Sequence, residues 1–235
     1  ENTSDTAVKL EKCNDSKIDN CDFNNLGGGG VLIDGNLNTV DNCGFSKIGC
    51  LYFKNHEPVK IDGSKNTISH NDISDASNTA LYIGGSENNI EFNDISGALT
   101  RSGGSVILIS DGALNNRIIG NYICDNNADT ADKNKYDTYG DRYIQQKSTV
   151  GRIRINYYDY ALGLYGTSGN EIKNNYFSGK LCGINLAVAK DNVISNNLIF
   201  TDGFALNEIV DFNKSAEEFF KTSDNNIIKN NFKNS

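Results

Sequence analysis

The 235-residue chain contains no tryptophan, no methionine and a single proline. Because methionine is absent even at residue 1, we expect residue 1 to follow a processing event rather than the start of translation. No apolar run is long enough to cross a bilayer as a helix, so we expect no membrane insertion. No secretory leader is recognisable at the start of the sequence.

Positive charge is scarce, with 22 Lys and Arg against 30 Asp and Glu, a formal net charge of −8 and a pI of about 4.8. Nucleic-acid backbones are bound by clustered Lys and Arg, so this deficit argues against a nucleic-acid partner. It also argues against an anionic membrane surface. A polysaccharide remains as a partner, and a polyanionic one would require a local basic patch or a bridging cation.

The six cysteines include no C-x-x-C pair, which argues against a zinc ribbon or a thioredoxin-like motif. Disulfides and buried free thiols both stay open for an exported protein.

One six-residue pattern recurs: aliphatic, x, x, Asn, x, aliphatic or aromatic. Clear copies are ISHNDI at 68–73, IEFNDI at 90–95 and ISNNLI at 194–199. The shared position is occupied by Cys21, Cys43, Asn71, Asn93, Asn121, Asn175, Asn197 and Asn230. The shortest step between these positions is 22 residues, so the base period is about 22 with insertions between some copies. The step of 54 residues between Asn121 and Asn175 predicts one further degenerate turn plus a loop.

A second pattern lies between the copies, as in VLIDG at 31–35, VKIDG at 59–63 and LYIGG at 81–85. Short runs rich in β-branched and aromatic residues, broken by Gly and Asn, favour strands over helices. Apolar residues five apart cannot both point to one side of a straight strand. We therefore expect a bend between them, with the Asn in the left-handed conformation and its side chain stacking in a ladder up the column.

Cys21 and Cys43 occupy the shared position one turn apart. They would lie about 4.8 Å from each other, the spacing of neighbouring strands. That spacing is within the Cα range of a disulfide, but side chains on in-register parallel strands point the same way. We favour a stacked pair of thiols that replaces the Asn ladder.

The run N-N-x-I-x-x-N-x-I, alternating with L-Y-I-G-G, resembles the parallel β-helix repeat proteins of the pectate lyase-like superfamily. The resemblance implies an all-β fold: a right-handed, single-stranded parallel β-helix that covers residues 1–235 as one domain. It also implies a carbohydrate-active or carbohydrate-binding protein that is secreted or located at the cell surface. The resemblance is specific for the fold and weak for the activity, because many chemistries share this scaffold.

Three insertions interrupt the repeat, at about 50–58, 124–160 and 201–226. The first is interpreted as a turn that bulges out before Pro58. In the third, Ser215 followed by Glu218 forms a capping box, which predicts a short helix near the C-terminus that covers part of the column.

The second insertion is the longest, and it combines carboxylates, arginines and tyrosines. Such a loop suits a sugar-binding or catalytic site, although a solvated loop explains it equally well. The candidate catalytic residues are Asp111, Asp141 and Asp159, and the candidate substrate-binding residues are Arg142, Arg152, Arg154, Tyr157 and Tyr158. Arg152 and Arg154 would share one face of a strand, where two guanidinium groups could bind a uronate.

Other candidates carry weaker signals. His70 lies inside a hexad with no recognisable Ser or Cys relay, so we interpret it as structural. Oxygen ligands at 34–38, 72–75 and 129–132 weakly suggest calcium, and none of them fits an EF-hand loop. The metal ligands are unknown from the sequence.

Three functional hypotheses remain open. The first is an extracellular polysaccharide lyase or hydrolase with its site near the 124–160 insertion. The second is a non-catalytic carbohydrate-binding or adhesion domain of a larger surface protein. The third is a trimeric structural spike. The sequence alone leaves it uncertain whether the protein is an enzyme.

Overall fold

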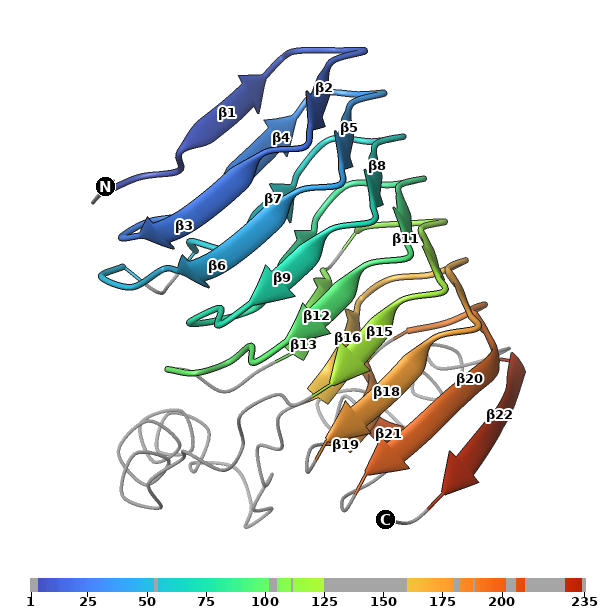
Figure 1. The fold of residues 1–235 in the computed structure, drawn as a ribbon. Coiled ribbons are helices and arrows are strands. Elements are labelled where there is room, and N and C mark those ends of the chain that lie inside the picture. Colours follow the sequence, from blue (N-terminus) through green and yellow to red (C-terminus); the bar gives the residue numbers. More distant parts are fainter. Residues whose placement is uncertain are drawn as a thin grey trace, which may run out of the picture.

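A computed structural model describes residues 4–52, 55–101, 105–110, 112–124, 160–179, 182–187, 189–201, 206–209 and 227–233. Within these residues the chain forms strands joined by turns, and no helix. All the strand pairs are parallel, and they build a column of eight coils (Figure 1). The predicted parallel β-helix is therefore confirmed, while a single domain over the whole chain stays a prediction.

Sheet A has eight strands, one from each coil. Its strands are β1 (Val8–Glu11), β4 (Val31–Asp34), β7 (Val59–Ile61), β10 (Leu81–Ile83), β13 (Ser105–Ile109), β16 (Tyr160–Tyr165), β19 (Cys182–Ala187) and β21 (Leu206–Ile209). The VLIDG and LYIGG patterns of the sequence form these strands.

The second sheet has two limbs, which we name B1 and B2. Limb B1 contains β2 (Lys17–Asp19), β5 (Thr39–Asp41), β8 (Thr67–Ser69), β11 (Asn89–Glu91), β14 (Arg117–Ile119) and β17 (Glu171–Lys173). Limb B2 contains β3 (Asp22–Leu26), β6 (Gly44–Ile48), β9 (Asp72–Ser74), β12 (Asp94–Ser96), β15 (Tyr122–Cys124) and β18 (Tyr176–Gly179). The longer β20 (Val193–Thr201) runs through both limbs, and β22 (Ile227–Lys233) pairs with it.

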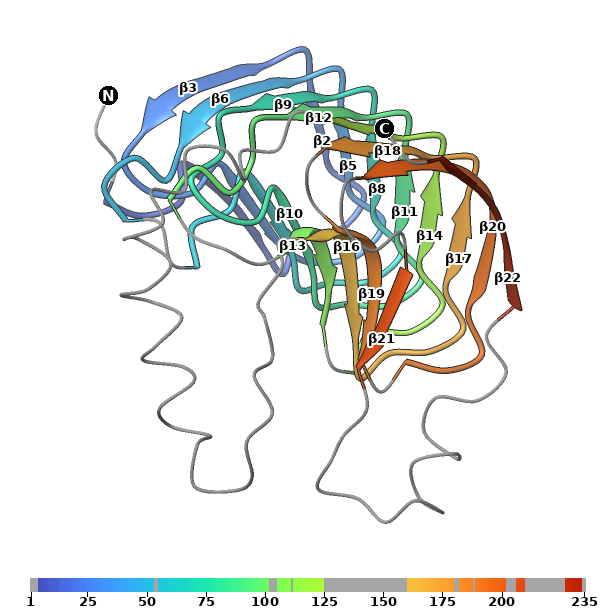
Figure 2. The ribbon, with the colours of Figure 1, turned by 90° about the horizontal axis from the view of Figure 1, so that it is seen from below.

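Figure 2 shows the three runs of strands around the column: sheet A, limb B1 and limb B2. The core fills the space between them with stacked aliphatic side chains. In a typical coil, Ile68 of limb B1, Ile73 of limb B2, and Val59 and Ile61 of sheet A are all fully buried. The two apolar residues of each hexad thus point inward from two strands that meet at a bend, as the sequence predicts.

A ladder of buried asparagines lies at the bend between B1 and B2. It contains Asn71, Asn93, Asn121, Asn175 and Asn197. The Asn93 amide shows the pattern: its Nδ2 donates to the Ile68 carbonyl at 2.9 Å and to Asn121 Oδ1 at 3.0 Å. Its Oδ1 accepts from the backbone and side-chain nitrogens of Asn71 at 3.0 and 2.9 Å. Every polar atom of the side chain is therefore satisfied inside the core.

The prediction that the ladder Asn itself adopts the left-handed conformation is wrong. The residue immediately before it has positive φ, for example His70 at 54° before Asn71 and Phe92 at 55° before Asn93. The left-handed residue turns the chain, and this turn leaves the following Asn free to point inward and bond along the column. Asparagine is selected at the ladder position for its amide rather than for its backbone.

A second ladder, which the sequence reading missed, lies at the corner between sheet A and limb B1. It contains Asn38, Asn66, Asn88, Asn116, Asn170 and Asn192. These residues are fully buried or nearly so, and each lies five positions before the corresponding position of the B1–B2 ladder. Hydrogen bonds of the side-chain amides run along the column axis at both corners, and they tie neighbouring coils together.

The expected extra turn between Asn121 and Asn175 does not exist. Strands β16, β17 and β18 pair directly with β13, β14 and β15, so no coil intervenes. Asn121 bonds directly to Asn175, with its backbone nitrogen 2.9 Å from Asn175 Oδ1. The residues that account for the long step, 125–159 between β15 and β16, lie outside the described residues.

The 50–58 insertion lies between β6 and β7, as expected. The 201–226 segment is not wholly an insertion, because Leu206–Ile209 forms strand β21 and pairs with β19. The helix predicted from Ser215 and Glu218 lies outside the described residues.

Candidate functional site

The site residues predicted from sequence all lie outside the described residues. They are Asp111, Asp141, Asp159, Arg142, Arg152, Arg154, Tyr157 and Tyr158. Their proposed roles stay predictions. The outer faces of the described coils can be compared directly, and limbs B1 and B2 differ sharply in how their charges are arranged.

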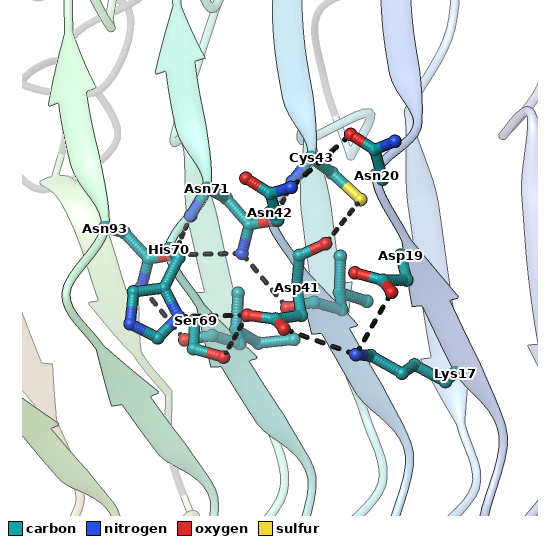
Figure 3. A network of polar contacts seen from close by, with 12 residues as sticks. Lys17, Asp19, Asn20, Asp41, Asn42, Cys43, Ser69, His70, Asn71 and Asn93 are labelled. Atoms are coloured by element: carbon teal, nitrogen blue, oxygen red, sulfur yellow. Dashed lines mark hydrogen bonds and ion pairs between the residues drawn. The ribbon is translucent and has the colours of Figure 1, made fainter.

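The outer face of limb B1 carries carboxylates that are all paired within the described residues. In the first coils, Lys17 Nζ lies 3.2 Å from Asp19 and 3.3 Å from Asp41 (Figure 3). Farther along, Arg117 lies 3.6 Å from Glu91 and 3.0 Å from Glu171, and Lys173 also bonds Glu171. These pairs neutralise the face coil by coil, which is typical of a solvated structural surface.

His70 lies at the corner between the limbs rather than inside a strand. Its Nδ1 is 3.0 Å from Asp41 Oδ1, and the same oxygen accepts a hydrogen bond from Ser69 Oγ at 2.9 Å (Figure 3). The His70 and Ser69 contacts both hold the pKa of Asp41 below its ordinary value. Ser69 is bonded to the carboxylate rather than to the imidazole, so this trio is not a nucleophile relay. It fixes the orientation of the His70 ring.

The outer face of limb B2 carries carboxylates that are not paired. One in-register column along the limb contains Asp22, Gly44, Asp72, Asp94, Tyr122, Tyr176 and Leu198. Within the described residues, the side chains of Asp22, Asp72 and Asp94 form no ion pair and no hydrogen bond. The only Lys or Arg in these B2 strands is Lys47, and it forms no ion pair within the same part of the chain.

Asp72 and Asp94 are directly opposite each other on adjacent strands. Partial burial and the neighbouring Asp72 charge both raise the pKa of Asp94 above its ordinary value. Like charges placed opposite each other across a sheet are destabilising. This coil-to-coil repulsion is unrelieved, in contrast to the balanced charges on B1.

Aromatic side chains cross five successive coils beside these carboxylates, one from each coil. We call them the aromatic strip: His70, Phe92, Tyr122, Tyr176 and Phe200. The His70 and Phe92 rings stack with centroids 5.6 Å apart, and the Tyr122 and Tyr176 rings stack at 4.6 Å with an angle of 7° between their planes. Tyr176 and Phe200 follow at 5.6 Å.

The strip is exposed at the point where it crosses the corner. The His70 side chain is 61 % exposed and Phe92 is 55 % exposed, although large apolar side chains usually pack inside. Phe92 also has a φ of 55°, which is rare for a bulky residue. The same corner position is left-handed in the other coils, so this φ is set by the turn of the coil, and the exposure of the Phe92 ring is what distinguishes it.

Gly120 makes room for the Phe92 ring. A Cβ on Gly120 would lie only 2.6 Å from Phe92 Cε1, so the ring lies against the glycine backbone of the next coil. Gly120 is two residues before Tyr122, the first residue of β15 on limb B2.

Glu57 is a further unpaired carboxyl group, located in the turn before β7. It is 6 % exposed, and its Oε2 has no hydrogen-bond partner. Burial raises the pKa of Glu57, and the nearby His56, Lys60 and Asp62 act on it electrostatically. It lies inside the wall of the column and is not accessible to a polymer.

Four cysteines within the described residues, Cys13, Cys21, Cys43 and Cys50, are free thiols. The Cys43 thiol donates to the Asp41 carbonyl at 3.1 Å, and the Cys21 thiol donates to the Asp19 carbonyl at 3.3 Å. The preference for thiols over a disulfide at Cys21 and Cys43 is therefore confirmed, while their stacking in place of the Asn ladder stays a prediction.

Neither a cluster of metal ligands nor a membrane-spanning helix occurs in the part of the chain that the structure describes. No three His, Cys, Asp or Glu side chains are grouped to hold a metal ion there, and calcium stays a prediction. That part also contains no helix of the length and apolarity that a membrane span requires.

Comparison with known families identifies one match. Residues 57–235 match the family described as the right-handed beta helix region. The chain belongs to this family. The match covers most of the chain and agrees with the parallel coils and the core described above, and it defines the hand of the column as right-handed. No curated protein matches the chain in the comparison with curated proteins.

The B2 residues were missed because the sequence was searched for acids in its insertions. The signal was nevertheless present within the repeat. Asp72, Asp94, Tyr122 and Tyr176 all immediately follow a ladder Asn. Because that position is always the first outward position of limb B2, aligning the hexads and reading the next column would have found them.

Proposed function

We propose that this β-helix protein binds an extended polysaccharide along limb B2, outside the cell or at its surface. The observation that carries the proposal is the aromatic strip, which supplies one ring from each of five successive coils. Neighbouring coils are about 4.8 Å apart, and one pyranose unit advances a polysaccharide by a similar distance. A regular polymer would therefore meet a ring at each step.

Sugar rings suit this surface for chemical reasons. The faces of a pyranose carry C–H groups that pack on aromatic rings, while its hydroxyl groups form hydrogen bonds at the edges. Tyr122 and Tyr176 add a phenolic hydroxyl to each ring, and Asp72 and Asp94 supply acceptors in the same column. The open face suits a long polymer better than a small ligand, which requires an enclosing pocket.

The test is binding of hexasaccharides of the main neutral polysaccharides, measured by calorimetry and by retention on insoluble polymer. Tyr122→Ala combined with Tyr176→Ala is expected to weaken binding by about tenfold for each ring removed. The matched control is Tyr82→Ala, which removes a tyrosine from the outer face of sheet A, where its ring lies 5.3 Å from Lys60 Nζ. Equal losses in both variants, or no binding by the unaltered protein, would contradict the proposal.

Hydrolysis is a second candidate function, favoured by the raised pKa of Asp94 beside Asp72. Glycoside hydrolases use two carboxyl groups with different pKa values, one protonated as the acid and one ionised. In this scheme Asp94 would donate the proton to the glycosidic oxygen, and Asp72 would act as the nucleophile or base. Release of reducing ends from a bound polymer, abolished by Asp94→Asn and by Asp72→Asn, is the expected result. Tight binding without any release of reducing ends would leave binding as the function.

A further inference from the structure

Two carboxylates and two stacked tyrosines form one patch in the in-register column of limb B2: Asp72, Asp94, Tyr122 and Tyr176. The chain reads His-Asn-Asp at 70–72 and Phe-Asn-Asp at 92–94, and in both cases the middle Asn points into the ladder. Asp72 and Asp94 are opposite each other on adjacent strands, while the stacked rings of His70 and Phe92 lie at the corner, where His70 contacts Asp41 of limb B1. The column continues from Asp94 to Tyr122 on the next coil.

The patch has an unbalanced negative charge. Among the described residues, no Lys or Arg forms an ion pair with Asp72 or Asp94, although the carboxylates of limb B1 are all paired. The repulsion between Asp72 and Asp94 is a cost that the fold carries in the absence of ligand. A cation held between the two carboxylates would remove this repulsion and gain attraction to both.

We infer that the polysaccharide bound along limb B2 is rich in glucosamine-type amino sugars, whose ammonium groups bind between Asp72 and Asp94. This inference rests on the proposed function and names the class of its ligand. Charge complementarity favours this ligand, because an acidic patch within an aromatic strip fits a chain that is both cationic and made of pyranose rings.

A divalent ion fits the patch less well than an ammonium group. Calcium takes six to eight oxygen ligands, and no third His, Cys, Asp or Glu within the described residues is grouped with these two carboxylates. An ammonium group needs only the two carboxylates and water, and the neighbouring ring faces attract it further. A polyuronate would be repelled by the same carboxylates.

The experiment compares β-1,4-linked glucosamine hexamers with their N-acetylated counterparts, which have the same backbone and no charge. Calorimetry at low salt in mildly acidic buffer is expected to show the glucosamine hexamer binding about five- to tenfold more tightly. The preference is expected to fall as salt is added and to disappear in alkaline buffer, where the amines are neutral.

The variant that isolates the patch is Asp72→Asn combined with Asp94→Asn. It removes a repulsive pair, so it is expected to fold at least as well as the unaltered protein. It should lose the preference for glucosamine, so that the glucosamine and N-acetylated hexamers bind with equal affinity. The matched control, Asp15→Asn with Asp34→Asn, makes the same change in net charge at exposed positions elsewhere on the coil and should keep the preference.

The outcomes separate this inference from the proposed function. If the neutral hexamers bind and glucosamine has no advantage, the amino-sugar inference fails while polysaccharide binding stands. If oligogalacturonate binds best, and only with calcium, the patch is an ion bridge and the inference is overturned. If no hexamer binds, the proposed function fails and this inference fails with it.

Discussion

Limbs B1 and B2 are built by the same repeat, share one Asn ladder and bury the same kind of aliphatic column, yet their outer faces differ. On B1, the carboxylates Asp19, Asp41, Glu91 and Glu171 each have a Lys, Arg or His partner. On B2, Asp22, Asp72 and Asp94 have no partner within the described residues, and aromatic rings follow them in the same column. This contrast supports the proposal that limb B2 binds a ligand, whereas the neutralised face of B1 is typical of a solvated surface.

The largest effect is expected at the corner that the two limbs share. Asn93→Ala would leave the Asn71 backbone N–H, the Asn71 amide and the Ile68 carbonyl without their partners inside the core. Because buried polar groups without partners are costly, the free energy of unfolding should fall by about 3 kcal/mol. Chemical denaturation measures the loss. Asn89→Ala, on the outer face of the same coil, should cost less than about 0.5 kcal/mol, and a similar loss in both variants would contradict the role of the ladder.

Glu57 is a buried carboxyl group without an ion-pair partner among the described residues, so it adds a buried example to the comparison of paired and unpaired carboxylates. Its folded-state pKa is raised above its ordinary value of 4.5, so its protonated form favours the fold. This contribution is complete below pH 4.5 and is lost as the pH rises through the folded-state pKa. Glu57→Gln should therefore gain about 1 kcal/mol at neutral pH and flatten the pH dependence of stability.

Thermal denaturation across pH measures the effect of Glu57. Glu11→Gln, an exposed carboxyl in β1, is the control and should leave the curve unchanged. A Glu57→Gln protein with an unaltered slope would show that the carboxyl group has a partner in solution.

A substitution at Gly120 tests the packing of the Phe92 ring at the corner. Gly120→Ala places a Cβ against the Phe92 ring, in a backbone with a φ of 68°. The free energy of unfolding should fall by about 1–2 kcal/mol, and glycan affinity should fall because the ring must move. Gly44→Ala is the matched control on B2, since its Cβ would meet only the flexible Asp22 side chain at 2.7 Å. A stable Gly120→Ala protein with unaltered affinity would show that the position of the Phe92 ring is unimportant for binding.

The smallest effect compares one carboxylate from each limb. Asp72→Asn should stabilise the fold by about a few tenths of a kcal/mol, while Glu171→Gln should destabilise it by a similar amount. The signs follow from the pKa directions. Burial and the Asp72 charge raise the pKa of Asp94. Asp94 therefore contributes stability that is present below its ordinary pKa of 3.8 and is lost as the pH rises.

The pKa of Glu171 is shifted in the opposite direction, because Lys173 and Arg117 lower it. Its contribution is present above its ordinary pKa of 4.5 and is lost as the pH falls. Urea titrations at two pH values would measure both variants, and changes of the same sign would remove the distinction between the limbs.

The fold was predictable because its requirements are local and repeated. Ile68 and Ile73 must point inward from either side of a bend, and that demand recurs in every coil with the same spacing. The ladder that begins at Asn38 was equally readable but was overlooked, because neighbouring asparagines such as Asn88 and Asn89 look alike in sequence. Only the structure separates the buried ladder member from its half-exposed neighbour.

The candidate site was not predictable by the same reasoning. Outward positions such as Asp72 and Tyr122 obey no packing rule, so a residue there has no local signature. Function was instead assigned to the composition of the longest insertion, and those residues lie outside the described part of the chain. The alignment of Asp72 with Asp94, and of Tyr122 with Tyr176, is visible only from the register between coils.

The left-handed residue before each ladder Asn has a consequence for how such a protein can change. At the corner between sheet A and B1, this position holds Asp15, Leu37, Lys65, Glu87, Asn115, Gly169 and Asp191 in successive coils. An acid, a base, an aliphatic residue and an amide all occupy it, since the neighbouring amide ladder maintains the corner. Each coil thus offers an outward position where single substitutions leave the corner intact, and these positions are regularly spaced along the column.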